Sequence, residues 1–135
     1  MARYNFLVFS NCTDPAREEE FNRWYTHIHV PDLSSAKGLI SARRYVNLEP
    51  DTKAKYLAVY EFETENIDDS LQSLYNLAAA AWPKGRHIDF IEGAPTISSP
   101  VVTFQEIDPD SLEPLEDFDY PTEPSEAVLA SFARH

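Results

Sequence analysis

The stretch 14-DPAREEEFNRWYTHIHVP-31 has the features of a helix with both ends marked. Asp14 is a suitable N-cap, Pro15 suits the first helical turn, and three glutamates follow near the positive end of the helix dipole. Pro31 disfavours helical backbone in the residue before it, so we expect the helix to end at about His29. With about 100° per residue, one narrow buried stripe contains Phe21, Trp24 and Ile28.

Strand-like segments rich in aromatic and branched apolar residues flank this helix and a second one. In chain order we expect a strand at 3–10, the helix above, strands at 39–47 and 55–63 joined by a loop that includes 49–52, a helix from Asp68 to Pro83, and a strand at 101–105. The order β-α-β-β-α-β is that of the ferredoxin-like split unit. The sequence therefore predicts an α+β fold with a four-stranded antiparallel sheet.

The strands are apolar on both faces. The first puts Tyr4, Phe6 and Val8 on one side and Leu7 and Phe9 on the other, and the third separates Tyr56, Tyr60 and Phe62 from Leu57 and Val59. A sheet with one solvated face should alternate apolar with polar residues. We therefore expect a second copy to cover the open face, giving a homodimer that buries more than about 1,000 Å² in total.

Composition limits the function classes. The chain has 135 residues, enough for one domain, with 23 acidic and 11 basic residues and a net charge of −12. So negative a surface repels phosphate backbones and anionic lipids, so neither nucleic acid nor membrane is an expected partner. The lone Cys12 allows no internal disulfide and no zinc site built on several cysteines. Without a long apolar run or an export pattern, a cytoplasmic protein is expected.

Residues 108–135 differ from the rest in composition. Eight acidic residues stand there against Arg134, so this segment holds −7 of the net charge, together with four of the ten prolines. Its apolar residues come in two groups, within 112–120 and 128–132, which free acidic tails usually lack. We therefore divide the chain into a body at 1–107 and an arm at 108–135. The arm is expected to lie over the body or a partner subunit, the partner being favoured, with a short helix near its end.

Polar residues border the buried stripe of the first helix. Asn22 and His29 lie within about 20° of each other on a helical wheel, with Tyr25 between them and the stripe, whereas His27 falls opposite and should face water. An amide, a phenol and a group that titrates near neutrality suit the orientation of a ligand and proton transfer. The structural alternative is a helix-end histidine stabilised by the dipole. We expect Asn22, Tyr25 and His29 to be catalytic.

Three segments form a longer pattern, FN-x-WY-x-x-x-H-x-PD followed by G-[FL]-x-x-A-x-R-[FY]. They are Phe21-Asn22-Arg23-Trp24-Tyr25, His29-Val30-Pro31-Asp32 and Gly38-Leu39-Ile40-Ser41-Ala42-Arg43-Arg44-Tyr45. Over about residues 3–107 the chain thus resembles the EthD-like group of the dimeric α+β-barrel superfamily. The resemblance implies a ferredoxin-like fold, a sheet-to-sheet homodimer, a pocket between sheet and helices, and His29 as acid or base. Relatives include cofactor-free monooxygenases, polyketide cyclases, decarboxylases, lyases, dehydratases and members without known activity.

The segment 82–90 is the second candidate region, because it places bases, a histidine and aromatic residues on an irregular stretch. Lys84 or Arg86 could pair with a substrate carboxylate or phenolate, and His87 could be a second proton-transfer group. In the alternative interpretation the segment is a solvated loop in which Arg86 pairs with Asp89 or Glu92.

Two other chemistries are disfavoured. A metal site at His27, His29 and Asp32 fails because helical residues two apart point away from each other. A hydrolytic triad that includes Ser10 lacks the G-x-S-x-G elbow, and no glycine-rich phosphate loop occurs. We therefore expect neither metal nor cofactor.

The many aromatic residues suit a flat, oxygenated ring as ligand. The expected substrate-binding residues are Trp24, Tyr45, Tyr60, Trp82, Arg86, His87 and Phe90. The sequence favours a cofactor-independent enzyme that uses a histidine acid/base on a hydroxylated aromatic or polyketide-like small molecule, in a lyase-type step such as decarboxylation, dehydration or retro-aldol cleavage. A cofactor-free monooxygenase, a non-catalytic binding or accessory protein and a haem-binding variant are the alternatives.

Overall fold

The structure, a computed structural model, describes residues 1–49, 53–96 and 99–133. Residues 50–52 of the expected loop and 134–135 of the arm lie outside the described residues. The strands are β1 (Ala2–Cys12), β2 (Leu39–Asn47), β3 (Tyr56–Thr64), β4 (Ile91–Gly93) and β5 (Phe104–Glu106). The helical elements are the 3-10 helix η1 (Pro15–Arg17), α1 (Glu18–Trp24), the π-helix η2 (Tyr25–His29), α2 (Val30–Leu33), α3 (Ile67–Ala81), the 3-10 helix η3 (Pro109–Ser111) and α4 (Glu126–Ser131).

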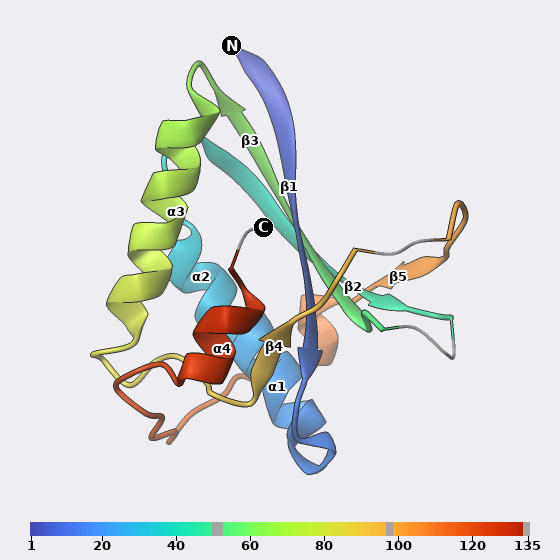
Figure 1. Cartoon of the computed structure of the whole chain (residues 1–135), viewed down its shortest axis with the longest axis vertical. Coiled ribbons are helices and arrows are strands. Elements are labelled where there is room, and N and C mark those ends of the chain that lie inside the picture. The colour runs from blue at the N-terminus through green and yellow to red at the C-terminus, as the bar shows by residue number, and fades with distance from the viewer. Residues whose placement is uncertain (50–52, 97–98, 134–135) are drawn as a thin grey trace.

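The chain is α+β with a five-stranded antiparallel sheet in the order β4-β1-β3-β2-β5 (Figure 1). This differs from the expected four strands. One edge of the sheet is the short β4, which was not expected and whose Ile91 pairs with Cys12 of β1. The expected strand at 101–105 corresponds to β5 at 104–106, which forms the opposite edge beside β2. Three residues carry too little periodicity to predict a strand, whereas the side chain of Ile91 is buried and supports the pairing with β1.

The two faces of the sheet are divided as the alternation in the strands predicts. Tyr56, Ala58, Tyr60 and Phe62 of β3 are buried toward the helices, whereas Leu57 and Val59 between them are only partly buried. The helices α1, α2 and α3 all lie on one side of the sheet (Figure 1). The most enclosed side chains of the core are Phe21, Trp24, Tyr25, Tyr60, Phe62 and Ile88.

The first helix continues through Pro31, beyond its predicted end. After α1, the N–H of Val30 donates to the carbonyl of Tyr25, the five-residue spacing of a π-turn. Within a regular α-helix the proline ring would clash with the carbonyl four residues earlier, and the wider turn accommodates the ring, so that α2 carries the chain on to Leu33. The π-turn also rotates η2 relative to a regular helical wheel, on which the sequence expectations rest.

Residues 108–133 lie against the body of the same chain. Arg23 donates to the carbonyl oxygens of Glu113 (3.1 Å) and Pro114 (2.7 Å). At the far end α4 packs on β4, where the N–H of Gly93 donates to the hydroxyl of Ser131 (3.0 Å). A Cβ on Gly93 would lie 2.4 Å from the carbonyl oxygen of Ser131, so only glycine permits this contact. Among the described residues, no helix is both long enough and apolar enough to cross a membrane.

Candidate functional site

Five aromatic rings from two distant parts of the chain form one cluster between the helices. His29 stacks on Trp24 at 4.7 Å between ring centroids and meets the ring of Tyr25 edge-on at 5.1 Å. His87 stacks on Trp82 at 4.1 Å and lies 5.2 Å from His29. The structure thus brings together Trp24, Tyr25, His29, Trp82 and His87, all of them expected site residues, and we refer to them as the ring cluster.

The segment after α3 is fastened to the first helix by polar contacts. The indole N–H of Trp24 donates to the carbonyl of Arg86 (2.9 Å). The guanidinium of Arg86 donates to both carboxylate oxygens of Asp32 (2.8 and 3.0 Å). Arg86 is therefore bound to α2. The solvated-loop interpretation, in which Arg86 pairs with Asp89 or Glu92, is wrong on this point. Its contribution is to hold His87 beside His29.

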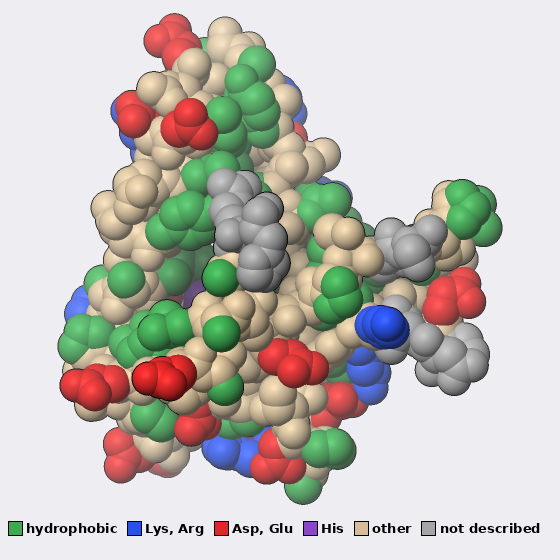
Figure 2. Space-filling model, in the orientation of Figure 1, with side chains coloured by type: hydrophobic (Ala, Val, Ile, Leu, Met, Phe, Trp, Pro, Cys, Tyr) green, Lys and Arg blue, Asp and Glu red, His purple; other side chains and the backbone are tan. Residues whose placement is uncertain are grey.

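His29 has the properties of a neutral base. Among the described residues neither nitrogen of its half-buried ring has a hydrogen-bond partner, and no fully enclosed side-chain nitrogen or oxygen lacks one, so both nitrogens reach accessible surface. Its pKa lies well below the ordinary value, because burial disfavours the imidazolium and electrostatic interactions with His87 and with the cation Arg44 lower it further. Figure 2 shows histidine surface at the bottom of a hollow beside α4.

Burial also keeps His87 neutral. The side chain is buried, and desolvation lowers its pKa to about 4 against the opposing effect of a hydrogen bond to Ile88. The ring cluster therefore contains two uncharged imidazoles at neutral pH.

Arg44 is a buried cation that sequence reasoning missed. It is 4% exposed, its guanidinium carbon lies 4.3 Å from the centroid of the Tyr25 ring, and it donates to the Thr26 hydroxyl and the Asn22 amide oxygen, both at 3.0 Å. In the part of the chain that the structure describes, none of its contacts is a carboxylate. The sequence did contain a signal, because Arg44 lies on the same face of β2 as Ala42 and Val46. A strand face that is otherwise apolar and packs on the helices thus carries a charged residue.

Tyr60 extends the site from the sheet. Its ring and that of Tyr25 are almost fully buried, and burial raises the pKa of both phenols, that of Tyr60 well above its ordinary value. The interaction between the two phenols raises the pKa of Tyr60 further and opposes the increase at Tyr25. Both phenols thus stay protonated at neutral pH and can donate hydrogen bonds.

Two residues of the first helix depart from their expected roles. Both amide hydrogens of Asn22 are used, by the carbonyl of Glu18 (3.2 Å) and the hydroxyl of Tyr56 (3.1 Å), while its oxygen accepts from Arg44. Asn22 therefore positions Arg44 and has no free hydrogen to orient a substrate. His27 is not fully exposed as expected but half-buried, because the arm contacts it and its Nε2–H donates to the carbonyl of Leu112 (2.7 Å).

Two further expected binding residues lie outside the ring cluster. Tyr45 pairs with Leu57 of β3, so its side chain belongs to the open face of the sheet, opposite to that of Tyr60. Phe90 is buried under the guanidinium of Arg17 at 3.8 Å, and its ring meets that of Tyr120 at 6.1 Å. The placement of Phe90 depends on the arm, which no local pattern could indicate.

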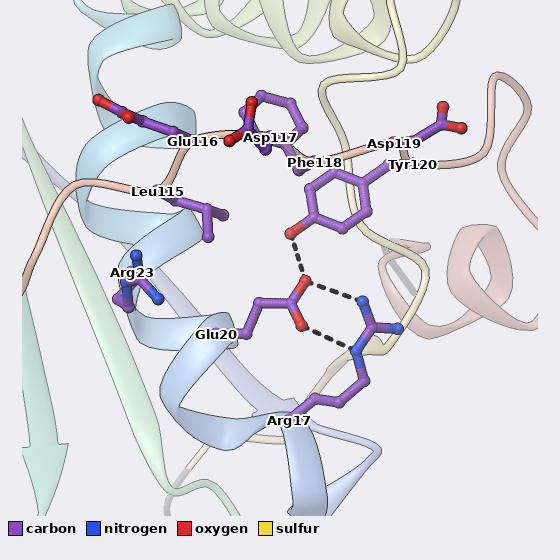
Figure 3. Close-up of a pocket in the computed structure, with 9 residues that line it drawn as sticks. All are labelled: Arg17, Glu20, Arg23, Leu115, Glu116, Asp117, Phe118, Asp119 and Tyr120. Carbon is purple, nitrogen blue, oxygen red and sulfur yellow. Dashed lines mark hydrogen bonds and ion pairs between the residues drawn. The ribbon is translucent and has the colours of Figure 1, made fainter.

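A pocket of about 360 Å³ lies between α1 and the arm (Figure 3). It is lined by Arg17, Glu20, Arg23, Leu115, Glu116, Asp117, Phe118, Asp119 and Tyr120, none of them an expected site residue. The hydroxyl of Tyr120 donates to Glu20 (2.6 Å), whose carboxylate also binds Arg17 (2.8 Å), as the dashed lines in Figure 3 show. Since these groups satisfy one another, we interpret the pocket as the seam by which the arm is attached.

The described residues contain no group of three or more histidine, cysteine, aspartate or glutamate side chains arranged to hold a metal ion. Comparisons with protein-family models, with curated proteins and with solved structures find no match to this chain.

Proposed function

We propose that the protein is a cofactor-independent enzyme in which His29 acts as acid and base on a hydroxylated aromatic or polyketide-like small molecule. The observation that carries this proposal is an imidazole that contacts aromatic rings, is neutral through burial, and has no hydrogen-bond partner for either nitrogen among the described residues. A general base must be unprotonated to accept a proton, and burial keeps His29 in that form at neutral pH. Aromatic walls favour a flat ring as ligand.

The polar groups near His29 suit a reaction that passes through an oxyanion. Transfer of a substrate proton to His29 leaves an electron pair that a conjugated ring moves onto oxygen. The fixed charge of Arg44 behind the Tyr25 ring, at 4.3 Å, would stabilise that negative oxygen in a site with little water. In a dehydration the same proton then passes from His29 to the departing hydroxyl, which leaves as water. We therefore favour a lyase-type step.

The fold and assembly proposed with this function are a ferredoxin-like unit and a homodimer. The first four strands in the order β4-β1-β3-β2, with helices on one face, support the former. The open face carries Leu7, Phe9, Tyr45, Leu57 and Val59, and Leu7 is 47% exposed. A second copy laid face to face would bury this surface. Light scattering of the native chain and of Leu7→Glu tests this, the native chain being expected as a dimer and the variant as a monomer.

The function is tested with a panel that includes 2,4-dihydroxybenzoic acid, incubated with and without oxygen. Release of carbon dioxide, or of a dehydrated product, both with and without oxygen supports the lyase. A strict requirement for oxygen supports the alternative of a cofactor-free monooxygenase. The turnover rate of His29→Ala should be about 100-fold or more below that of the native protein.

The matched control is His27→Gln, which lies on the same π-turn and keeps a donor for the carbonyl of Leu112. Equal activity in His29→Ala and native protein refutes the role of His29, and binding without conversion favours an accessory protein.

A further inference from the structure

The hydrogen bond of His87 determines which of its nitrogens carries hydrogen. Its Nδ1 lies 2.8 Å from the carbonyl oxygen of Ile88. A carbonyl oxygen can only accept, so Nδ1 must be the protonated nitrogen. Because the ring is neutral above pH about 4, its Nε2 carries no hydrogen and presents a lone pair. The backbone itself thus sets the tautomer.

The orientation of the ring is fixed as well. Trp82 stacks on one face of the imidazole with an interplanar angle of 14°, and Trp24 lies 4.9 Å away at 57°. The preceding residue, Arg86, is held through its carbonyl by Trp24 and through its guanidinium by Asp32. A side chain locked by packing and by hydrogen bonds of its neighbours is what a preorganised catalytic group requires.

The lone pair of Nε2 has no partner within the described residues. It is not fully enclosed either, since no enclosed side-chain nitrogen or oxygen there lacks a partner. The ring of His29 lies beside that of His87, with 5.2 Å between the ring centroids and an interplanar angle of 74°. Two imidazoles so close together can hold one proton but resist a second. While one ring carries a proton, the other therefore remains a base.

We infer that His87 is a second catalytic residue, which takes a proton at Nε2 from the hydroxyl of a phenolic substrate bound against His29. The O–H bond breaks, its electron pair stays on the ring as a phenolate, and the imidazolium returns the proton to a ring carbon or a leaving group within the same turnover. No oxidant or cofactor enters this balance. The inference rests on the proposed function, to which it adds a phenol as the substrate class and a division of work between the two histidines.

Nuclear magnetic resonance of the imidazole nitrogens in the native chain tests the tautomer directly. The expected spectrum shows hydrogen on Nδ1 and none on Nε2 of His87 at pH 7. Hydrogen on Nε2 at that pH would overturn the inference, because no lone pair would then face the substrate.

Deuterium exchange into resorcinol tests the catalytic role. In D₂O the enzyme removes the phenolic proton, a ring carbon of the phenolate takes up a deuteron, and the same carbon then loses its original proton. The ring hydrogens are thereby exchanged for deuterium without consuming the probe. His87→Asn is the informative variant, because its amide still offers a donor toward the carbonyl of Ile88 but has no base in the Nε2 position. Its exchange rate should fall by about 100-fold or more, with the dependence of the residual rate on pD altered and the melting temperature close to that of the native chain.

The outcomes separate the two proposals. Loss of exchange in both His29→Ala and His87→Asn supports the division of work. Loss in His29→Ala with native rates in His87→Asn overturns the inference and leaves the proposed function standing. Absence of exchange in the native chain contradicts the proposed function, and the inference with it.

Discussion

Acidification should destabilise the native state through His87, and the size of the effect follows from its burial. In the folded chain its pKa is about 4, whereas an unfolded chain has the ordinary value of about 6.5. Between these two pKa values the unfolded state therefore binds more protons than the folded state. The contribution of His87 to the unfolding free energy is fully present above pH about 6.5 and is lost as the pH falls toward about 4. At about 1.4 kcal/mol per pH unit, the total loss is about 3 kcal/mol, of which about 2 kcal/mol has gone by pH 5.

Urea unfolding of the native chain and of His87→Asn at several pH values between 7.5 and 4.5 isolates this contribution. Carboxylates titrate in both proteins, so the difference between the two curves of unfolding free energy against pH reports His87 together with its coupling to His29. We expect the native chain to lose about 2 kcal/mol more than the variant between pH 7.5 and pH 5. Parallel curves would refute the reasoning, because they would mean that His87 carries its proton as easily in the folded chain as in the unfolded one.

Three further perturbations test other parts of the structure. Gly93→Ala places a methyl group against the carbonyl of Ser131, so α4 must shift and the unfolding free energy should fall by about 1–3 kcal/mol, whereas no change in urea unfolding would contradict this docking of α4. Arg44→Ala leaves the amide oxygen of Asn22 and the hydroxyl of Thr26 without their donor and should cost about 3 kcal/mol by thermal unfolding; a neutral outcome would mean that water reaches these groups. Deleting residues 108–135 removes the partners of Arg23, His27 and Gly93 and should lower the melting temperature, and an unchanged value would reduce the arm to a solubilising tail.

The parts of the site that were predictable are those carried by local patterns. Trp24, Tyr25 and His29 stand out because a helical wheel places apolar and polar residues at defined angles. His87 stands out by composition, as a histidine among aromatic residues and bases. That the two histidines meet at 5.2 Å could not be predicted, because the contact depends on Arg86 reaching Asp32 across the fold.

Errors in the expected roles have the same origin. The pattern of the first helix correctly identified Asn22 as a polar residue at the edge of the buried stripe. Its hydrogen-bond partner Arg44 comes from β2, and the π-turn changes the angles after Trp24. His27 was assigned to water because a helical wheel contains no information about an arm that begins some eighty residues later.

By itself the sequence determined the order of the main strands and helices and the two faces of β1 and β3, because a period of two or 3.6 residues is a property of neighbouring residues and of the backbone they share. Only the tertiary structure decided which edges of the sheet receive β4 and β5, that the arm binds His27, and that the partners of Arg44 among the described residues are Thr26 and Asn22. These features depend on contacts between residues far apart in the chain. Their energies come from desolvation and packing, which no local pattern contains.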